Sequence, residues 1–410
     1  MRNLLLFLSF FLVCTINGQT DKKKMLSKVN NPDKFFKINY EDLLTKEKFI
    51  GLKQLASKVD YIQLETNNDC LVNGLAKYLF SDSLIFINNV DHILKFSING
   101  KFLIKIGSPG RGPGEIVRIM EMSVVPDKRL IVVQNSGNRN LLYYSFNGDL
   151  IKTIDNPSRC IIKVMNDGRY IANDRGSSIS EKYTFRLTNE TGDTISVVKN
   201  NTNWANPSGA AVVFTNTSFE PFYSYQNRYY FKTLYNDTVY VVNGNKIIPS
   251  YFVNLGKFKL PDENRIERLS PEQTQTFRDN SSKYYFAKVL EAGERIFLTT
   301  YSFGKGPIYY FVLDKKGLIQ NLVTNYAGGT SIIINDWDGC APFWPIGNIN
   351  NNQVFMPIDV VRLKKFFDLR KSIQVPTEYA ERQKQLENMI SKLDIASNPI
   401  IMIVTLKPDI

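Results

Sequence analysis

Residues 82–107 read DSLIFINNVDHILKFSINGKFLIKIG, and residues 129–155 repeat the pattern as RLIVVQNSGNRNLLYYSFNGDLIKTID. Each copy holds three apolar runs separated by turn residues, and the Asn-Gly pairs at 99–100 and 147–148 lie 48 residues apart. Three strands cannot bury their apolar faces alone, so the repeat indicates units that cover one another. Asn-Gly is typical of tight hairpins, and we expect both central residues to adopt positive φ.

Weaker copies of this unit follow at residues 161–174, 185–199, 229–248 and 295–324. The turn glycines at 100, 148, 192 and 244 are spaced by 48, 44 and 52 residues, and Gly317 comes 73 residues later, which indicates an insertion. Four strands in about 45 residues is the signature of a β-propeller blade. The sequence therefore predicts an all-β fold, a six-bladed β-propeller with four-stranded antiparallel blades. A seven-bladed ring and an array of β-sandwiches are the alternatives.

The C-terminal part predicts two helices. Residues 359–371 place Val360, Leu363 and Phe367 on one helical face. Residues 377–394 follow Pro376 with a threonine as the expected cap. Their apolar stripe consists of Tyr379, Leu386, Ile390 and Leu393. We expect this stripe to pack against the propeller, and docking of a partner is the alternative.

Residues 400–406 form an apolar strand after the helical segment. An apolar strand without a neighbour invites association with other chains. We therefore expect this strand to pair with an early strand of the chain and to close the ring.

The N-terminal residues 1–18 have the organisation of a secretory signal peptide. Arg2 precedes an apolar run over residues 4–13, which is too short to span a bilayer. We expect cleavage after Gly18, a leader over residues 19–50 and the propeller domain over residues 51–410. The alternatives are a buried strand and a lipoprotein acylated at Cys14, which lacks the usual small residue before it. The mature protein is expected in the periplasm or at the cell surface, and no later segment is apolar for long enough to cross a membrane.

The charged, histidine and cysteine residues limit the kinds of site. The net charge is +12, but the Lys and Arg residues are dispersed, and the one dense run, at 22–24, lies in the leader, so no nucleic-acid partner is expected. His92 is the only histidine, which argues against a multi-histidine metal site, and we expect neither a metal nor a cofactor.

Three cysteines, Cys70, Cys160 and Cys340, remain after residue 18, so they cannot all pair with one another. They are expected as buried thiols or as one disulfide and one thiol.

Three short motifs resemble those of exported six-bladed β-propeller proteins of Bacteroidetes-type bacteria. They are Tyr-Ile-x-Leu-Glu-Thr at residues 61–66, Gly-x-Gly-Pro-Gly-Glu at 110–115 after a hairpin, and Asn-Pro before an apolar strand at 398–400. The resemblance covers about residues 40–408. It implies the propeller fold and an exported location, often alongside surface-glycan metabolism, and it implies no established reaction.

The most unusual loop spans residues 107–115 and contains four glycines and two prolines. Its backbone amides could cradle an anion, with Arg111 adding a charged hydrogen bond and Glu115 completing the loop. It is not a nucleotide-binding loop, because no Gly-Lys-Ser/Thr ends it. The alternative is a connection between blades whose glycines permit a sharp backbone path.

Trp204, Trp337 and Trp344 all lie in irregular segments rich in Asn, Gly or Pro. Indole rings on loops can form platforms for sugar rings, and the alternative is packing under the loops. The predicted ligand-binding residues are therefore these three tryptophans together with Arg111 and Glu115.

The function that these features favour is binding. We expect an exported protein that recognises a glycan- or peptide-related ligand or an envelope protein, since no catalytic cluster is evident and the fold alone implies no reaction. One alternative is a saccharide-active lyase or hydrolase with its site at the propeller channel. The other is a structural subunit of an envelope complex that docks through the helix at residues 377–394.

The signal-peptide hypothesis predicts the start of the mature chain. Protein isolated from its native host should begin at Gln19, because the apolar run ends shortly before Gly18. Mass spectrometry of the intact protein measures this directly. Retention of Met1, or a lipid on Cys14, would contradict cleavage after Gly18.

Overall fold

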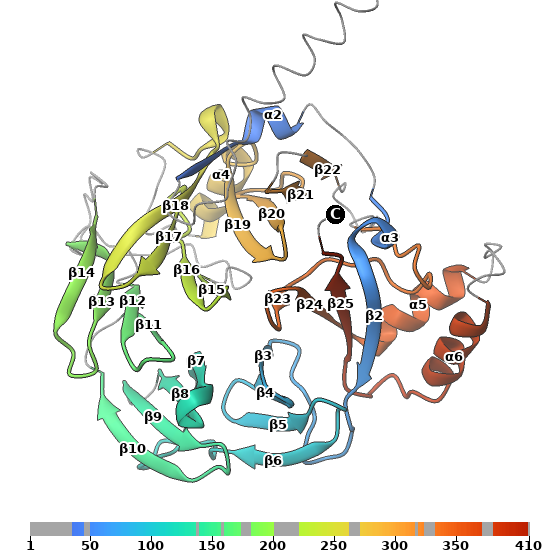
Figure 1. Cartoon of the computed structure of the whole chain (residues 1–410), viewed down its shortest axis with the longest axis horizontal. Coiled ribbons are helices and arrows are strands. Elements are labelled where there is room, and N and C mark those ends of the chain that lie inside the picture. Colours follow the sequence, from blue (N-terminus) through green and yellow to red (C-terminus); the bar gives the residue numbers. More distant parts are fainter. Residues whose placement is uncertain are drawn as a thin grey trace, which may run out of the picture.

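The computed structural model of the protein describes residues 35–44, 50–136, 139–156, 160–173, 182–200, 221–261, 271–315, 319–323, 333–370 and 380–408. Their strands form six separate sheets arranged in a ring, and the first strand of each blade lies nearest the centre (Figure 1). The predicted six-bladed β-propeller is therefore confirmed. The expected signal peptide, residues 1–18, lies outside the described residues.

The first five blades follow one another along the chain. Blade 1 consists of β3 (Lys77–Ser81), β4 (Leu84–Asn88), β5 (Ile93–Ser97) and β6 (Phe102–Ile106). Blade 2 consists of β7 (Ile119–Val125), β8 (Leu130–Asn135), β9 (Asn140–Ser145) and β10 (Leu150–Asp155). Blade 3 consists of β11 (Ile161–Val164), β12 (Tyr170–Asn173), β13 (Tyr183–Thr188) and β14 (Thr194–Lys199). Blade 4 consists of β15 (Phe222–Tyr225), β16 (Arg228–Phe231), β17 (Thr238–Asn243) and β18 (Lys246–Asn254). Blade 5 consists of β19 (Tyr285–Ala292), β20 (Arg295–Ser302), β21 (Tyr309–Asp314) and β22 (Ile319–Val323).

Blade 6 joins the two ends of the chain. It consists of β23 (Gly347–Asn348), β24 (Gln353–Ile358), β25 (Ile400–Leu406) and β2 (Ala56–Gln63), with β2 outermost. Val59 of β2 pairs with Val404 of β25, and Tyr61 pairs with Met402. The predicted closure of the ring by residues 400–406 is confirmed, and both edges of β25 are paired.

The repeated Asn-Gly turns differ from the expected geometry. Gly100 and Gly148 have φ of 84° and 98°, whereas Asn99 and Asn147 do not have positive φ. The N–H of Gly100 donates to Ser97 O at 2.9 Å, and the blade 2 turn makes the equivalent bond at 3.0 Å. The expectation of two positive φ angles was wrong. Each connection is a type I turn followed by a left-handed glycine, which is another favoured hairpin form.

The outermost strands of blades 1 to 3 share a further irregularity just after this turn. One residue is skipped in the pairing with the neighbouring strand, namely Leu103 in β6, Ile151 in β10 and Ile195 in β14. All three skipped residues are aliphatic, and β-bulges of this kind bend the strand and project the extra residue.

Residues 36–44, expected as part of a leader, contribute to the packing of the ring. β1 (Phe36–Asn39) adds to blade 4 as a fifth strand and runs parallel to β18. α2 (Tyr40–Leu44) follows, and Tyr40 is fully buried. Its ring contacts four aromatic side chains, those of Phe258, Tyr285, Tyr309 and Phe311. The chain then enters α3 (Leu52–Leu55) and β2, so its N-terminal part extends from blade 4 past blade 5 to blade 6.

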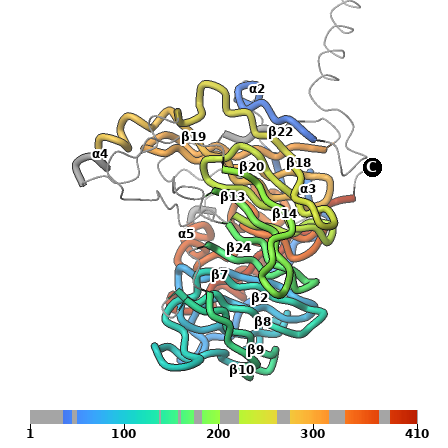
Figure 2. The backbone as a smooth tube through the Cα atoms, turned by 90° about the vertical axis from the view of Figure 1, so that its left-hand side faces the viewer, coloured from blue at the N-terminus to red at the C-terminus, as the bar shows by residue number. Residues whose placement is uncertain are grey.

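The ring has two unlike faces. On the turn face, short turns join the first strand of a blade to the second, and the third strand to the fourth. On the helical face lie the connections between the second and third strands and between successive blades. These connections carry α4 (Pro271–Asn280), α5 (Val360–Arg370) and α6 (Ala380–Ser391). Figure 2 shows α4 and α5 on the same side of the ring. Long connections on a rigid scaffold are the usual location of a binding site.

The apolar stripes of the two C-terminal helices are buried. Val360, Leu363 and Phe367 of α5 lie in one core cluster with Leu386 and Ile390 of α6. Leu393, just beyond α6, belongs to the same cluster, and Tyr379 lies outside the described residues. The expected packing against the propeller is confirmed, so this stripe is not available for docking a partner.

Ring closure predicts that the C-terminal strand stabilises the whole domain. Deletion of residues 399–410 removes β25, leaves β2 and β24 without their shared neighbour and exposes apolar side chains of the blade 6 core. We expect the ring to lose its cooperative thermal unfolding, as measured by circular dichroism. Deletion of residues 409–410 alone is the control and should leave the melting temperature unchanged. A wild-type melting temperature for the longer deletion would contradict the closing role of β25.

Candidate functional site

A buried asparagine fixes the loop at residues 65–76, which joins blade 6 to blade 1 on the helical face. The Nδ2 of Asn398 donates to the carbonyl oxygens of Glu65 at 2.7 Å and Cys70 at 2.8 Å. Its Oδ1 accepts the N–H of Val72 at 2.8 Å. These bonds tie the loop to the start of β25, so the Asn-Pro motif before this strand has a structural role.

Asn89 holds the same loop from the side of blade 1. Its Oδ1 accepts the N–H of Asn73 at 2.6 Å, and its Nδ2 donates to Leu71 O at 3.0 Å. The same Nδ2 lies 2.9 Å from His92 Nε2. Because both amide hydrogens and the oxygen are engaged, the loop is held by specific bonds from two sides.

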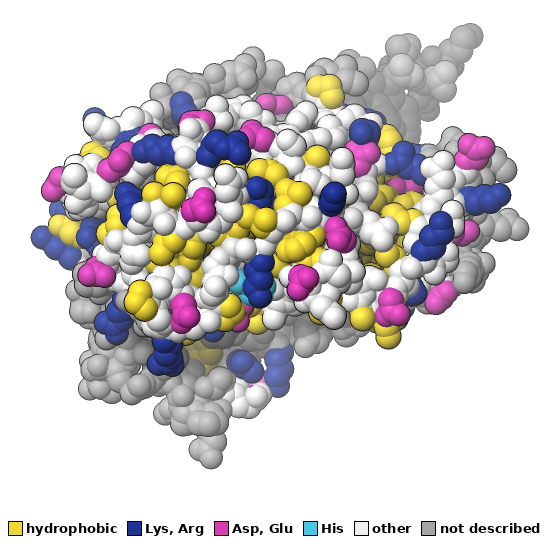
Figure 3. Space-filling view, turned by 90° about the horizontal axis from the view of Figure 1, so that it is seen from below, with side chains coloured by type: hydrophobic (Ala, Val, Ile, Leu, Met, Phe, Trp, Pro, Cys, Tyr) yellow, Lys and Arg dark blue, Asp and Glu magenta, His cyan; other side chains and the backbone are white. Residues whose placement is uncertain are grey.

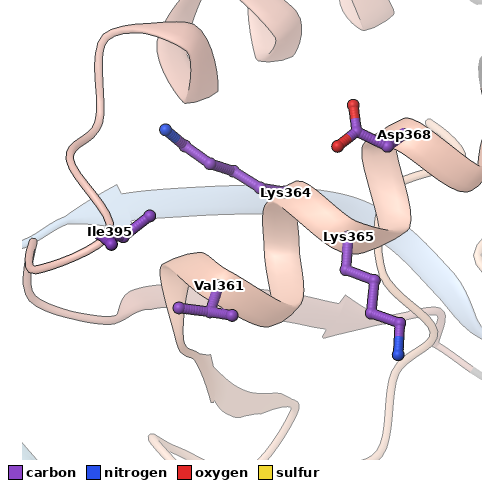
Figure 4. Close-up of a pocket in the computed structure, with 5 residues that line it drawn as sticks. All are labelled: Val361, Lys364, Lys365, Asp368 and Ile395. Carbon is purple, nitrogen blue, oxygen red and sulfur yellow. The ribbon is translucent and has the colours of Figure 1, made fainter.

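α5 begins at a side-chain cap and borders a surface hollow. Asp359 Oδ1 accepts the N–H of Arg362 at 2.7 Å, which satisfies one of the free amides of the first turn. The hollow has a volume of about 500 Å³ and is lined by Val361, Lys364, Lys365, Asp368 and Ile395. In Figure 4 Val361, Lys364 and Ile395 lie around one space, whereas Lys365 points away from Ile395.

Four exposed aliphatic side chains lie in connections of the helical face, Leu71 and Leu75 in the loop at residues 65–76 and Val361 and Ile395 at the hollow, and we call them the helical-face patch. Their exposed fractions are 49% for Leu71, 69% for Leu75, 58% for Val361 and 68% for Ile395. Asn398 binds the residues on both sides of Leu71 and lies three positions after Ile395, so it places the loop beside the start of β25. Exposed apolar side chains on fixed backbone are typical of interaction sites.

The glycine-rich loop satisfies its own amides in part. Glu115 Oε2 accepts the N–H of Gly112 at 2.7 Å, and a side chain at Gly110 would collide with the same carboxylate. Asn135 Nδ2 donates to Glu115 O at 2.9 Å and fixes the end of the loop. Arg111 is exposed. The carboxylate of Glu115 thus occupies part of the position expected for an anion, and the binding role of Arg111 stays a prediction.

The predicted tryptophan platforms lie in different surroundings. Trp344 is buried, its Nε1 donates to Thr299 Oγ1 at 3.0 Å, and its ring packs against Phe297 and Tyr310. Trp337 is partly buried against the same core cluster. Trp204 lies outside the described residues. Of the predicted ligand-binding residues that the structure describes, Arg111 and Glu115 lie in the connection between blades 1 and 2, and Trp337 and Trp344 lie in the connection between blades 5 and 6. The indole of Trp344 is buried.

Trp337 precedes a buried carboxylate, that of Asp338. The hydroxyl of Tyr61 lies 3.0 Å from both carboxylate oxygens of Asp338. Asn335 Nδ2 donates to this carboxylate at 2.8 Å, and so does the Cys340 N–H at 3.0 Å. Asp338 thereby folds the loop before β23 onto β2. The cysteines Cys70, Cys160 and Cys340 are buried free thiols, so the expected alternative of a disulfide is wrong.

A buried ion pair of blade 5, at the contact with blade 4, was not anticipated from the sequence. Glu291 of β19 is fully buried, and Lys315 Nζ lies 2.9 Å from its Oε2. Tyr223 and Tyr251 of blade 4 donate to the two carboxylate oxygens, each at 2.7 Å. The Lys315 ammonium also lies 3.7 Å from the centre of the Tyr225 ring.

The acid–base properties of this ion pair follow from burial and mutual charge. Burial, followed by the Glu291 carboxylate, raises the pKa of Tyr223 well above its ordinary value. Burial alone would lower the pKa of Lys315, but the interactions with Glu291 and Tyr225 together raise it by more. The net shift of the Lys315 pKa is therefore upward. Lys315 therefore stays charged and Tyr223 stays neutral at physiological pH. The arrangement serves to join two blades, and removing one partner would leave a buried charge unpaired.

Two further properties of the described residues limit the chemistry. Among them, no group of three or more His, Cys, Asp and Glu side chains is placed to hold a metal ion. None of the helices within the described ranges is long and apolar enough to cross a membrane.

The hydrogen bonds that hold the loop at residues 65–76 through Asn89 depend on the protonation state of His92. Its Nδ1 lies 2.6 Å from Asp91 Oδ1, and its Nε2 faces the Nδ2 of Asn89. Because that amide is a donor, Nε2 must be an acceptor, which requires the neutral ring. Burial lowers the pKa of His92, against the opposing effect of Asp91, and Lys105 lowers it further.

The lowered pKa predicts how stability changes with pH. The unfolded state binds a proton at His92 near pH 6.5 while the folded state does not, so stability is present above this pH and falls as the pH drops below it. The slope should not exceed about 1.4 kcal/mol per pH unit, the limit for one proton. Urea unfolding at pH 7.5 and 5.5, about one unit on either side of the ordinary pKa, measures this.

The control is His92→Gln, in which the histidine contribution is absent because the chain has no other histidine. Its stability should change less between the two pH values than that of the wild type. An equal pH dependence in both proteins would contradict the coupling.

Comparison with known proteins bears on the family and the fold. A search of curated proteins finds no match. Among solved structures, an exported-protein candidate from Bacteroides fragilis NCTC 9343 is similar with a TM-score of 0.68 and 17% identity, over 91% of this chain and 100% of the other. A DUF4221-family protein from Bacteroides vulgatus ATCC 8482 has a TM-score of 0.46 and 12% identity, over 86% and 97% of the two chains. At these identities the likeness concerns the fold alone.

A family model described as a domain of unknown function, DUF4934, matches residues 35–405. The match begins at β1 and ends within β25, so it includes the N-terminal strand on blade 4 and the strand that closes the ring. The protein therefore belongs to the DUF4934 family.

Proposed function

We propose that the protein is an exported binding protein and that its partner is a segment of another polypeptide, held at the helical-face patch. The observation that carries this proposal is the hollow beside α5, where Val361 and Ile395 are each more than half exposed. Their backbone is fixed by the buried face of α5 and by Asn398. Covering such ordered, water-exposed aliphatic side chains with a partner lowers the free energy and therefore favours binding.

The kind of exposed side chain favours a polypeptide over a glycan. Among the described residues, the large apolar side chains that are exposed are aliphatic, with Phe35 as the exception. Trp344, which was expected to present a flat face to a sugar, is buried in the core. Aliphatic side chains on a partly apolar surface match the apolar side chains of a bound peptide or helix.

The charge near the hollow favours an acidic partner. Lys365 is exposed beside Val361, and Lys364 donates to the carbonyl of Leu393 at 2.5 Å while its ammonium remains at the border of the hollow. Asp368 lies on the same side and offsets part of this charge. With a net charge of +12 for the whole chain, a segment with aliphatic residues next to Asp or Glu is the best match.

Two features support a location outside the cytoplasm. Residues 1–18 have the organisation of a signal peptide, and the similar protein from Bacteroides fragilis is described as an exported-protein candidate. We propose the periplasm or the cell surface as the site of action. The buried free thiols agree with either compartment, because buried cysteines behave as small apolar side chains.

Site-specific photo-crosslinking in the native host tests the partner. A photoreactive phenylalanine analogue placed at Ile395 or at Val361 should give the same polypeptide adduct. The analogue at Ile334, which is also exposed but lies beside Gly51, is the matched control and should not give it. Val361→Asp should reduce the yield at position 395 by about tenfold, since it places a charge in an apolar contact. Adducts with glycan alone, or equal adducts from position 334, would contradict the proposal.

A further inference from the structure

The outer edge of β10 is the starting point, because an unpaired strand edge is a template for another strand. The chain covers two comparable edges itself: β1 pairs along β18, and Arg382 of α6 donates to the carbonyl of Val59 in β2. Within the described residues β10 has no neighbour on its outer side. Five of its six residues are exposed.

Exposed aliphatic side chains gather at this edge. The exposed fractions are 43% for Leu150, 57% for Ile151 and 39% for Leu103, the residue of β6 that corresponds to Ile151. A side chain at Gly148, in the turn before β10, would lie 3.4 Å from Ile104 of β6, so the two strands adjoin. Figure 3 shows a stretch of apolar side chains on the side of the molecule where blades 1 and 2 lie. We call Leu103, Leu150 and Ile151 the rim patch.

Natural edge strands are guarded by several devices, among them β-bulges, an outward-pointing lysine and a proline. β10 has a bulge at Ile151 but neither a proline nor a lysine that points outward from its edge. The single lysine of β10, Lys152, places its ammonium 4.4 Å from the centre of the Tyr143 ring of β9. It therefore lies across the face of the sheet and leaves the backbone of the edge accessible.

The charges around the rim patch carry both signs. Lys101 and Lys105 are exposed at β6, and Asp149 and Asp155 are exposed at the two ends of β10. An anionic lipid surface or a polyanion would favour positive charge alone. A patch with both signs can face its own copy across a two-fold axis without the repulsion that a patch of a single sign would cause.

We propose that a second copy of this chain docks at the rim patch, with the two β10 edges paired antiparallel about a two-fold axis. Blade 2 and its copy then form one continuous sheet of eight strands. The bulged Ile151 projects at the start of the edge and packs against the partner copy. This surface lies at the outer strands of the ring, so it leaves the helical-face patch free for a different partner.

Sedimentation equilibrium of the protein lacking residues 1–18 tests the dimer. The wild type should show twice the monomer mass, and Ile151→Asp should raise the dissociation constant by about tenfold or more because it buries a charge in the contact. Ile334→Asp is the control, since it adds the same charge at another exposed isoleucine, and it should leave the mass unchanged. Far-ultraviolet circular dichroism establishes that each variant is folded.

A cysteine substitution tests the orientation of the strands. Thr153→Cys in the middle of β10 should form a disulfide-linked dimer on mild oxidation, because a two-fold axis brings the same residues together. Thr191→Cys, exposed in the turn after β13, should not, and the native cysteines are buried.

Three results would overturn the proposal. One is a wild-type monomer at about 0.1 mM, where even a weak specific interface associates. Another is a dimer whose dissociation constant Ile151→Asp does not change and in which Thr153→Cys gives no disulfide-linked dimer on oxidation. The third is a monomer that binds anionic lipid vesicles through Ile151, which would assign the rim patch to a membrane surface.

Discussion

The pairing of β2 with β25 is the constraint on which the rest of the structure depends. Each blade buries its apolar faces against the two neighbouring blades, so an open ring would leave two blades half covered. The hydrogen-bonded pairing of these two strands, in which Val59 lies opposite Val404, closes the ring with residues from both ends of the chain. The loop at residues 65–76, α5 and α6 all lie next to this junction, and Asn398 binds the loop directly. The helical-face patch therefore depends on ring closure for its fixed geometry.

The features that the sequence predicted are those encoded by local periodicity. The repeat at residues 82–155 revealed the blades because its turns and apolar runs recur at a constant spacing, and the stripe of α5 showed the helical period. β1 was missed because Phe36 and Ile38 are its only buried residues, and its partner strand lies about two hundred residues away. Glu291 and Lys315 are single charged residues in or beside apolar strands, and nothing local marks them as a pair. Trp344 was expected at the surface because its segment is irregular, yet irregular backbone can also cover a core.

The two proposed surfaces differ in the way the chain prepares them. On the helical face, buried amides and capped helices hold exposed aliphatic side chains in place, as Asn89 and Asn398 do for Leu71. At the rim, the backbone itself is exposed, and the skipped residue of a β-bulge supplies the apolar contact at Ile151. Side-chain recognition suits a specific partner, whereas strand pairing suits an identical copy, because the same edge serves both sides. The molecule can thus use one face for recognition and its circumference for assembly.

The position of β1 has a consequence for the order of folding. Its partner, β18, is synthesised more than two hundred residues later, and the partner of β2 is almost the last segment of the chain. Contacts that far apart in sequence form slowly, because a long loop must close before they contribute any stability. β1 and β2 consequently have no partner strands while the remainder of the chain is still being made. The export that we propose would suit such a topology if the chain crosses the membrane unfolded, since the ring closes only when the final strand is present.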